Sequence, residues 1–270
     1  MSPFYQHKII AITGATSGIG RALALQLLQK GAKVAICGRD ENKLNEMRAE
    51  ANNADLLCIQ ADISQEADCK QFIEQTVQQL GGIDVLINNA GISMRALFEE
   101  VDLKVLKQSM DINYWGTVYC CKYALPHILK SKGSIAGISS VAGYKGLPCR
   151  TGYSSSKFAM QGFLESLRIE LLHRKVNVLW ISPGFVASNI RNVALNADGK
   201  AQKETPLNEK GLMSAEECAH GILQAIEKRK RSLIMTFQGK LTVWMNTFFP
   251  SFVDRQVYKH FANEPDSPLK

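Results

Sequence analysis

The feature that most restricts how this chain can fold is a regular alternation of short apolar runs with amphipathic segments. The first run is Lys8–Thr13 (KIIAIT), and Arg21–Lys30 follows it with the apolar spacing of a helix that Gly31 closes. The later runs are continuous rather than alternating, as strands are when helices cover both faces of a parallel sheet. These predicted strands are Lys33–Cys37, Leu56–Gln60, Val85–Asn88, Ser134–Ser139, Val176–Ile181 and Leu233–Met235. The pattern indicates an α/β fold with a doubly wound parallel sheet.

The segments between the strands have helical spacing. Ser214-x-x-Glu217 is a capping box, which predicts a helix from there to about Lys228. The other predicted helices are Lys43–Ala51, Gln65–Leu80, a long segment from about Leu103 to Leu129, and Tyr153–Leu172. The 270 residues contain no internal repeat, low-complexity tract or linker, so a single domain is predicted.

Charge and composition bear on the kinds of partner. The formal net charge is +7, and part of the basic excess lies in the run Lys228–Arg231. Such a run either attracts nucleic acid or anionic lipid, or forms a solvated helix end. No nucleic-acid-reading motif accompanies it, so no nucleic-acid partner is expected. The five histidines lack metal-ligand spacing, and no metal site is predicted.

The cysteines and the amino-terminal segment bear on location. Seven cysteines are present without a C-x-x-C motif, which favours buried free thiols in a reducing compartment over a disulfide framework. Met1–Lys8 lacks the layout of a signal peptide, and no apolar run reaches the roughly 18 residues of a spanning helix. We therefore expect a cytoplasmic protein.

A glycine-rich turn joins the first strand to the first helix. Thr13–Gly20 reads TGATSGIG, with the spacing G-x-x-x-G-x-G. Glycine allows the backbone to turn sharply and to approach a pyrophosphate without an intervening Cβ, and the helix amino terminus offers N–H groups to phosphates. An ordinary tight loop is the alternative, but the position within a β-turn-α-β unit favours dinucleotide binding.

Several motifs together resemble the short-chain dehydrogenase/reductase family in order and spacing. The resemblance covers about Lys8 to Met235 and implies a Rossmann-type sheet of about seven strands. It also implies an enzyme that moves hydride between nicotinamide and a carbonyl or alcohol carbon. The motifs are TGATSGIG, Asn88-Asn89-Ala90-Gly91, Asn113, Ser140, Tyr153-x-x-x-Lys157 and Pro183-Gly184.

The resemblance also implies which residues bind the cofactor. Asp62 would meet the adenine, Lys157 the nicotinamide ribose, and the segment after Pro183 the carboxamide. The implied cofactor-binding residues are Gly14, Thr16, Ser17, Gly18, Ile19, Gly20, Arg39, Asp62, Ile63, Asn89, Ala90, Gly91, Tyr153, Lys157, Pro183, Gly184 and Val186.

Four residues are candidates for catalysis. Tyr153 and Lys157 stand four apart on one helix face, so the ammonium is expected to lower the pKa of the phenol. Tyr153 would then exchange a proton with the substrate oxygen while Ser140 hydrogen-bonds that oxygen. Asn113 matches a family position that connects the site to a water relay. Each candidate also has a purely structural alternative. Ser139 or Ser140 could cap the end of a strand, and Tyr153 and Lys157 could form an exposed pair on a helix. Asn113 could be a buried polar residue that the backbone satisfies.

The end of the second predicted strand bears on which cofactor binds. NAD-selective family members place an acid there to receive the ribose hydroxyls, whereas this chain has Gly38 followed by Arg39. A guanidinium suits a 2′-phosphate, so NADP(H) is predicted. Asp40 is either a second acid near the ribose or a helix cap, and Arg21 is a further cation that could lie nearby.

The substrate predictions concern the carboxyl-terminal third and several residues that precede it. Residues 189–212 are expected to form a substrate lid, and Ser188 could supply a hydroxyl where family members often have threonine. The tail combines aromatic residues with a preceding basic run, and it resembles the tails of membrane-associated, steroid- or lipid-active members. It would cover the pocket, contact a second subunit or lie peripherally on a membrane. The candidate pocket walls are Met94, Tyr144, Leu147, Pro148, Cys149 and Phe185.

These observations predict an NADP(H)-dependent oxidoreductase acting on a hydrophobic lipid- or steroid-like ketone or alcohol. The predicted division is a catalytic part at residues 1–239 and an aromatic and basic extension at 240–270 within the same domain. The family resemblance implies a homodimer or homotetramer. The alternative is a non-catalytic NADP(H)-binding sensor or scaffold protein, for which the set Ser140, Tyr153 and Lys157 would serve no chemical purpose.

Overall fold

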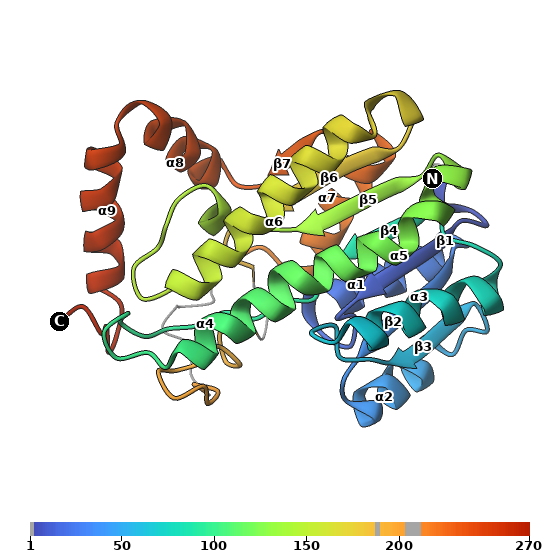
Figure 1. Ribbon diagram of the computed structural model, residues 1–270, viewed down its shortest axis with the longest axis horizontal. Helices are drawn as coiled ribbons and strands as arrows, with labels where there is room; N and C mark the ends of the chain where they lie inside the picture. Colours follow the sequence, from blue (N-terminus) through green and yellow to red (C-terminus); the bar gives the residue numbers. More distant parts are fainter. Residues whose placement is uncertain (1–2, 187–189, 203–211) are drawn as a thin grey trace.

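The structure, a computed structural model, describes residues 3–186, 190–202 and 212–270. Seven parallel strands form one sheet in the order β3-β2-β1-β4-β5-β6-β7 (Figure 1). The predicted doubly wound, Rossmann-type parallel sheet is therefore confirmed. The strands are β1 (Ile9–Thr13), β2 (Lys33–Gly38), β3 (Leu56–Gln60), β4 (Val85–Asn88), β5 (Ser134–Ile138), β6 (Asn177–Ser182) and β7 (Ser232–Ile234).

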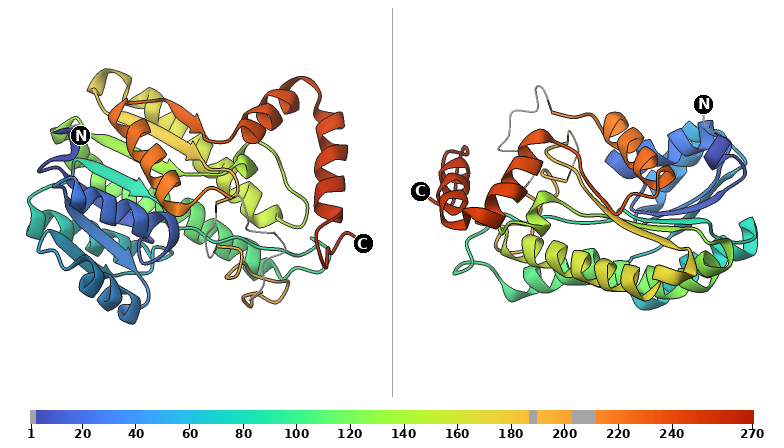
Figure 2. Two further views of the ribbon diagram at one scale, coloured as in Figure 1. Left: turned by 180° about the vertical axis from the view of Figure 1, so that it is seen from behind. Right: turned by 90° about the horizontal axis from the view of Figure 1, so that it is seen from above.

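Helices cover both faces of the sheet, which is why its strands are apolar along their whole length (Figure 2). On one face α1 (Gly18–Gln29), α2 (Glu41–Ala51) and α7 (Ala215–Glu227) enclose a core that includes Leu23, Leu44 and Ile222. The other face has its own core, which includes Phe72 and Leu164. The helices on that second face are α3 (Glu66–Leu80), α4 (Leu103–Met110), α5 (Gly116–Ser131) and α6 (Thr151–Glu170).

Most predicted boundaries agree with the structure to within a few residues, because capping residues mark them. The Ser214 hydroxyl accepts a hydrogen bond from the backbone of Glu217, and the Glu217 carboxylate accepts one from the backbone of Ser214. This capping box begins α7, as the sequence predicts. Short 3₁₀ turns lie at Pro3–Tyr5, Val141–Gly143 and Leu172–Arg174.

The long helix predicted from Leu103 to Leu129 is interrupted. A π-helical turn at Asp111–Trp115 separates α4 from α5. The Asn113 side chain in this turn is buried and is hydrogen-bonded to the backbone of Ile92 and to Ser156 on α6. These tertiary bonds accompany the wider turn, and π-helical turns of this kind are frequent at functional sites.

The tail forms two further helices, α8 (Phe237–Phe248) and α9 (Pro250–Ala262). In Figure 1, α9 lies at the opposite end of the molecule from α2 and β3, beside the loop that precedes α6. The predicted division between residues 239 and 240 falls inside α8. Across the described ranges, no helix combines the length and the hydrophobicity that crossing a bilayer requires.

Candidate active site

A cleft of about 450 Å³ lies at the carboxyl ends of the strands. It is centred where the strand order reverses between β1 and β4, the position at which doubly wound sheets bind ligands. Two of the predicted site residues, Gly20 and Asn113, lie behind its surface. The predicted residues that line it are Gly14, Thr16, Ser17, Gly18, Ile19, Arg39, Asp62, Ile63, Asn89, Ala90, Gly91, Ser140, Tyr153, Lys157, Pro183, Gly184 and Val186.

The glycine-rich turn is shaped to bring backbone N–H groups to the cleft. Gly14 has φ +64°, and a Cβ there would lie 2.7 Å from Cα of Ala90, so a larger residue would be both strained and too close. Ser17 is the N-cap of α1, and its side chain makes no capping hydrogen bond. The first turn of α1 therefore keeps its N–H groups for an anionic ligand.

Asn89, at the end of β4, holds this turn in place. Its Nδ2 donates to the carbonyl oxygens of Thr13 and Gly14, at 3.1 and 2.8 Å. Gly20 lies against the same amide, because a Cβ on Gly20 would be 2.5 Å from Nδ2 of Asn89. Both residues thus position the glycine-rich turn, with Gly20 packed against it from behind.

The remaining predicted contacts come from loops after β3 and β6. The Asp62 carboxylate accepts the backbone N–H of Ser64 at 3.0 Å, which orders the loop that places Ile63 at the cleft. Pro183, Gly184 and Val186 directly follow β6 at the opposite side of the cleft. The hydroxyl predicted at Ser188 lies outside the described residues, and so do residues 189 and 203–211 of the lid predicted at 189–212.

The end of β2 leaves no acid facing the cleft. A Cβ at Gly38 would lie 2.8 Å from Cγ2 of Thr16, so the position has no room for an aspartate or glutamate without displacement. The Asp40 carboxylate accepts the backbone N–H groups of Asn42 and Lys43, which identifies it as the cap of α2. Arg39 lies exposed at the cleft edge, and among the described residues its guanidinium makes no hydrogen bond or ion pair.

Two other cations, Arg21 and Lys43, lie on the helices on either side of β2, and only one of them lines the cleft. The Arg21 guanidinium is paired with Glu50, with Nε 2.8 Å from Oε2, and it does not line the cleft. The prediction that Arg21 adds charge to the cofactor site is therefore not supported. Lys43, one turn into α2 after Arg39, does line the cleft and was missed. The sequence feature that could have identified Lys43 is its place in the first turn of the helix that follows β2.

Two serines, Ser139 and Ser140, directly follow β5, and the sequence assigns the catalytic role to Ser140. Ser139 Oγ is buried and accepts a hydrogen bond from Gln161 Nε2 at 2.8 Å. Ser140 Oγ, by contrast, accepts the backbone N–H of Ala142 at 3.2 Å and lies near enough to the Tyr153 hydroxyl to lower the pKa of Tyr153. The Ser140–Tyr153 pair lies at the cleft, where both hydroxyl groups can meet one substrate oxygen.

Lys157 lies beneath Tyr153 and is 3% exposed. Its Nζ donates to the carbonyl oxygen of Ile138 at 2.8 Å, which fixes the ammonium at the end of β5. A Cβ built on Gly91 would be 3.0 Å from Oδ1 of Asn113 and 3.3 Å from Nζ of Lys157. Asn113 and Lys157 are therefore neighbours behind the β4 loop, and the absence of a side chain at Gly91 permits this packing.

The pKa values of the pair follow from burial first. Burial raises the pKa of Tyr153 above its ordinary value, against the smaller lowering effects of the Ser140 hydrogen bond and the Arg150 charge. Burial also lowers the pKa of Lys157 to about 8. The prediction that the Lys157 ammonium lowers the pKa of Tyr153 is thus wrong. The pKa of Tyr153 is raised, because burial has the largest effect on it.

The substrate end of the cleft is mainly apolar. Of the six predicted wall residues only Leu147 and Phe185 line it. Met94 is instead buried against α6, where its Sδ accepts the backbone N–H of Gly152 at 3.2 Å. Wall residues that sequence reasoning missed are Ile92, Ile190, Val193, Leu195, Arg150 and Phe261. Phe261, in the tail, carried no sequence signal because it is 108 residues beyond Tyr153.

Solved structures share this architecture. A short chain dehydrogenase/reductase SDR from Burkholderia phymatum in complex with NAD superposes with a TM-score of 0.81 at 23% identity, covering 95% of this chain and 97% of that one. A 3-ketoacyl-(acyl-carrier-protein) reductase from Brucella melitensis complexed with NADH has a TM-score of 0.75 at 22% identity, covering 85% and 96%. At 22% and 23% sequence identity, these similarities establish the shared fold alone.

Sequence comparison extends the likeness beyond the fold. An 11-beta-hydroxysteroid dehydrogenase A from Arachis hypogaea is 32% identical over 271 residues, covering 97% of this chain and 77% of the relative. A dehydrogenase/reductase SDR family member 7B from Xenopus laevis is 33% identical over 258 residues, covering 92% and 80%. The profile of the family described as short chain dehydrogenase matches residues 8–198. The chain therefore belongs to the short-chain dehydrogenase/reductase family, a family of oxidoreductases that act on alcohol and carbonyl groups.

Proposed function

We propose that this enzyme transfers hydride between NADP(H) and a hydrophobic, lipid- or steroid-like ketone, aldehyde or secondary alcohol. The observation that carries the proposal is that the neighbouring hydroxyl groups of Ser140 and Tyr153 line the same cleft as the glycine-rich turn. This places a proton donor and a hydrogen-bonding hydroxyl beside a phosphate-binding helix terminus, the combination that carbonyl reduction needs.

The proposed roles of the catalytic residues follow from their contacts. A bound nicotinamide would supply or accept the hydride. Tyr153 donates a proton to the substrate oxygen during reduction and accepts it during oxidation, while Ser140 holds that oxygen by a hydrogen bond. Lys157 supplies positive charge beneath the phenol, and Asn113 fixes the loop beside it.

Three features at the end of β2 support NADP(H) over NAD(H). Thr16 excludes an acidic side chain from position 38, and Asp40 is engaged at the α2 terminus. The Arg39 guanidinium and the Lys43 ammonium lie at the cleft edge, where they can pair with a 2′-phosphate. The remaining cofactor contacts that we propose are those of the cleft-lining loops described above, with Gly20 and Asn89 acting through the glycine-rich turn.

The apolar walls support a hydrophobic substrate. Ile92, Leu147, Phe185 and Phe261 line the end of the cleft beyond Tyr153. The relative from Arachis hypogaea is named as a hydroxysteroid dehydrogenase, which favours the same substrate class. We propose that residues 240–270 belong to the same domain as the catalytic part, since Phe261 of this extension forms part of the wall.

The tail also supports a role in association. Phe237, Trp244, Phe248 and Phe252 are at least half exposed, so α8 and α9 present aromatic surface to their surroundings. We propose a cytoplasmic homodimer or homotetramer whose tail makes peripheral membrane contact. Support for a reducing compartment comes from the seven cysteines, all buried and free. Liposome flotation of the full chain, compared with a W244S/F248S variant, tests the membrane contact.

The test of the reaction is turnover with a panel of ketones, followed by NADPH absorbance at 340 nm and repeated with NADH. We expect reduction of hydrophobic ketones and a higher kcat/KM for NADPH. A preference for NADH would overturn the cofactor assignment. NADPH binding without turnover of any ketone or alcohol would instead indicate a sensor or scaffold protein.

A further inference from the structure

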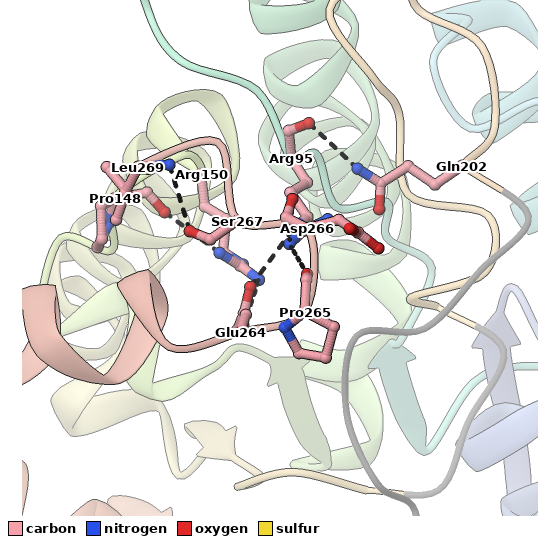
Figure 3. Close-up of polar contacts among 9 residues, drawn as sticks. All are labelled: Arg95, Pro148, Arg150, Gln202, Glu264, Pro265, Asp266, Ser267 and Leu269. Carbon is pink, nitrogen blue, oxygen red and sulfur yellow. Dashed lines mark hydrogen bonds and ion pairs between the residues drawn. The ribbon is translucent and has the colours of Figure 1, made fainter.

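A cluster of buried charges lies at the substrate end of the cleft, and the reaction described above does not use it. It consists of Arg95, Arg150 and Glu264, here called the Glu264 cluster (Figure 3). Glu264 is 5% exposed, and the side chains of Arg95 and Arg150 are 12% and 14% exposed. Buried charges of this kind need partners, because desolvation otherwise costs more than the ion pairs return.

Glu264 bridges the two arginines. Nη2 of Arg150 donates to both carboxylate oxygens, at 3.0 and 3.2 Å. Nε of Arg95 lies 3.3 Å from Oε2 of Glu264 as an ion pair, without a hydrogen-bond partner of its own. The Nη2 of Arg95 donates to the carbonyl oxygens of Pro265 and Asp266. The tail segment after α9 is thus held by these two guanidinium groups.

The cluster reaches the cleft wall through Arg150. Arg150 lines the cleft, and its charge acts on Tyr153, three residues further along. The Phe261 ring packs on the guanidinium of Arg150, with 4.3 Å between ring centre and Cζ, and it lines the same cleft. A substrate that reaches Tyr153 from this end therefore passes next to Arg150.

The charges of the cluster do not cancel. Two guanidinium groups face one carboxylate, and a guanidinium is the group that best recognises a carboxylate through paired hydrogen bonds. Without Glu264, Arg95 and Arg150 would form a ready-made site for a carboxylate carried by a substrate. With Glu264 in place, that position is filled by a residue of the enzyme's own tail.

We propose that Glu264 is a specificity-determining residue: it occupies a carboxylate site formed by Arg95 and Arg150 and thereby restricts the enzyme to uncharged substrates. The proposal rests on the proposed function and adds the exclusion of anionic ketones to it. It also gives the tail a role inside the site, through Phe261 and Glu264, in addition to its exposed aromatic surface.

The test compares two ketones of similar shape, 4-methylacetophenone and 4-acetylbenzoate, with the wild-type protein and Glu264→Gln. In the wild type we expect the KM of the carboxylate ketone to exceed that of the neutral ketone. In Glu264→Gln we expect the KM for 4-acetylbenzoate to fall on the order of tenfold, the worth of one charge-assisted hydrogen bond. The kcat for the neutral ketone should stay within about threefold, since Tyr153 and Ser140 are untouched.

Asp254→Asn is the matched control. Asp254 is another carboxylate of the tail that pairs with a cation, Lys145, but its side chain is 64% exposed, and Lys145, unlike Arg150, does not line the cleft. Its removal should leave both KM values unchanged. The double variant Arg150→Gln with Glu264→Gln should lose the gained affinity for 4-acetylbenzoate, because the recognising guanidinium is then absent.

A binding measurement separates failure of this proposal from failure of the proposed function. Calorimetric titration with benzoate needs no turnover, and we expect tighter binding to Glu264→Gln than to the wild type. If neither ketone is reduced while benzoate binding still depends on Glu264 and Arg150, the reaction is wrong and the carboxylate site stands. Equal benzoate binding by the wild type, Glu264→Gln and the double variant would overturn the carboxylate site.

Glu264→Ala provides a second variant with more room for an incoming carboxylate, and it should show the same shift. Glu264 follows α9 and lies outside both cores of the sheet, so neither variant removes core packing. Thermal unfolding of each variant checks this point. If neither variant folds, Glu264 is a structural residue and the specificity proposal is withdrawn.

Discussion

The ammonium nitrogen of Lys157 lies 5.7 Å from the centre of the Tyr153 ring. The two side chains are four residues apart on α6, and the Ile138 carbonyl holds the ammonium in this position. Lys157 is buried and Tyr153 is partly buried, so each has a pKa shifted toward its neutral form. The site therefore holds the Lys157 ammonium at a position where burial favours the neutral amine.

Tyr153→Phe should lower kcat/KM by about 10²–10⁴-fold, because the ring keeps its packing but loses the proton that it exchanges with substrate. The measurement is ketone reduction followed at 340 nm, with NADPH binding measured separately by fluorescence. Binding should change little. Activity within threefold of the wild type would show that another group transfers the proton.

Lys157→Met should raise the free energy of unfolding at pH 7 by about 1–3 kcal/mol while removing activity. The lysine pKa is depressed in the folded chain, from 10.5 to about 8. Between pH 8 and pH 10.5 the unfolded chain binds more protons than the folded chain. The loss of stability that the buried Lys157 causes in the wild type is therefore complete below pH 8 and disappears as the pH rises toward 10.5. Urea unfolding from pH 7 to 10 checks this.

The control for that measurement is Lys122→Met, which changes an exposed lysine on α5. Its stability relative to the wild type should not depend on pH across this range. A Lys157→Met variant that is less stable than the wild type at pH 7 would contradict the buried-charge argument.

Arg150→Gln should move the pH dependence of alcohol oxidation to higher pH. The Arg150 charge lowers the pKa of Tyr153, so its removal raises that pKa further. Oxidation requires the phenolate and increases as the pH rises through the pKa, whereas reduction requires the phenol and is lost there. The profile of kcat/KM against pH in both directions measures the shift.

An exposed arginine in the turn after α6, Arg174, provides the comparison. Arg174→Gln should leave both profiles in place. A profile for Arg150→Gln that moves to lower pH would mean that Arg150 acts on the site other than through its charge.

Arg39→Gln should raise the KM for NADPH by on the order of 10–100-fold and change the KM for NADH little, since a charge-assisted pair to the 2′-phosphate is lost. Steady-state kinetics with both nucleotides checks the ratio. Arg21→Gln is the matched control, because Arg21 is paired with Glu50 and does not line the cleft. Equal effects of the two substitutions would argue against a specific phosphate contact.

Prediction from sequence worked best where a property is local. The glycine-rich turn, the capping box at Ser214 and the apolar strands each depend on a few consecutive residues, and the structure has all of them. It failed where one residue has several possible partners. Arg21 has the right charge and position for a phosphate, yet it is paired with Glu50 on the next helix.

By itself, the amino-acid sequence determined the order of strands and helices, the glycine-rich turn and the spacing of Tyr153 and Lys157, because these follow from short-range periodicity and backbone stereochemistry. Only the tertiary structure decided that Glu264 meets Arg150 across 114 residues and that Tyr153 is shielded enough for burial to govern its pKa. Long-range pairing and desolvation depend on how whole elements pack, and no local pattern in the chain records them.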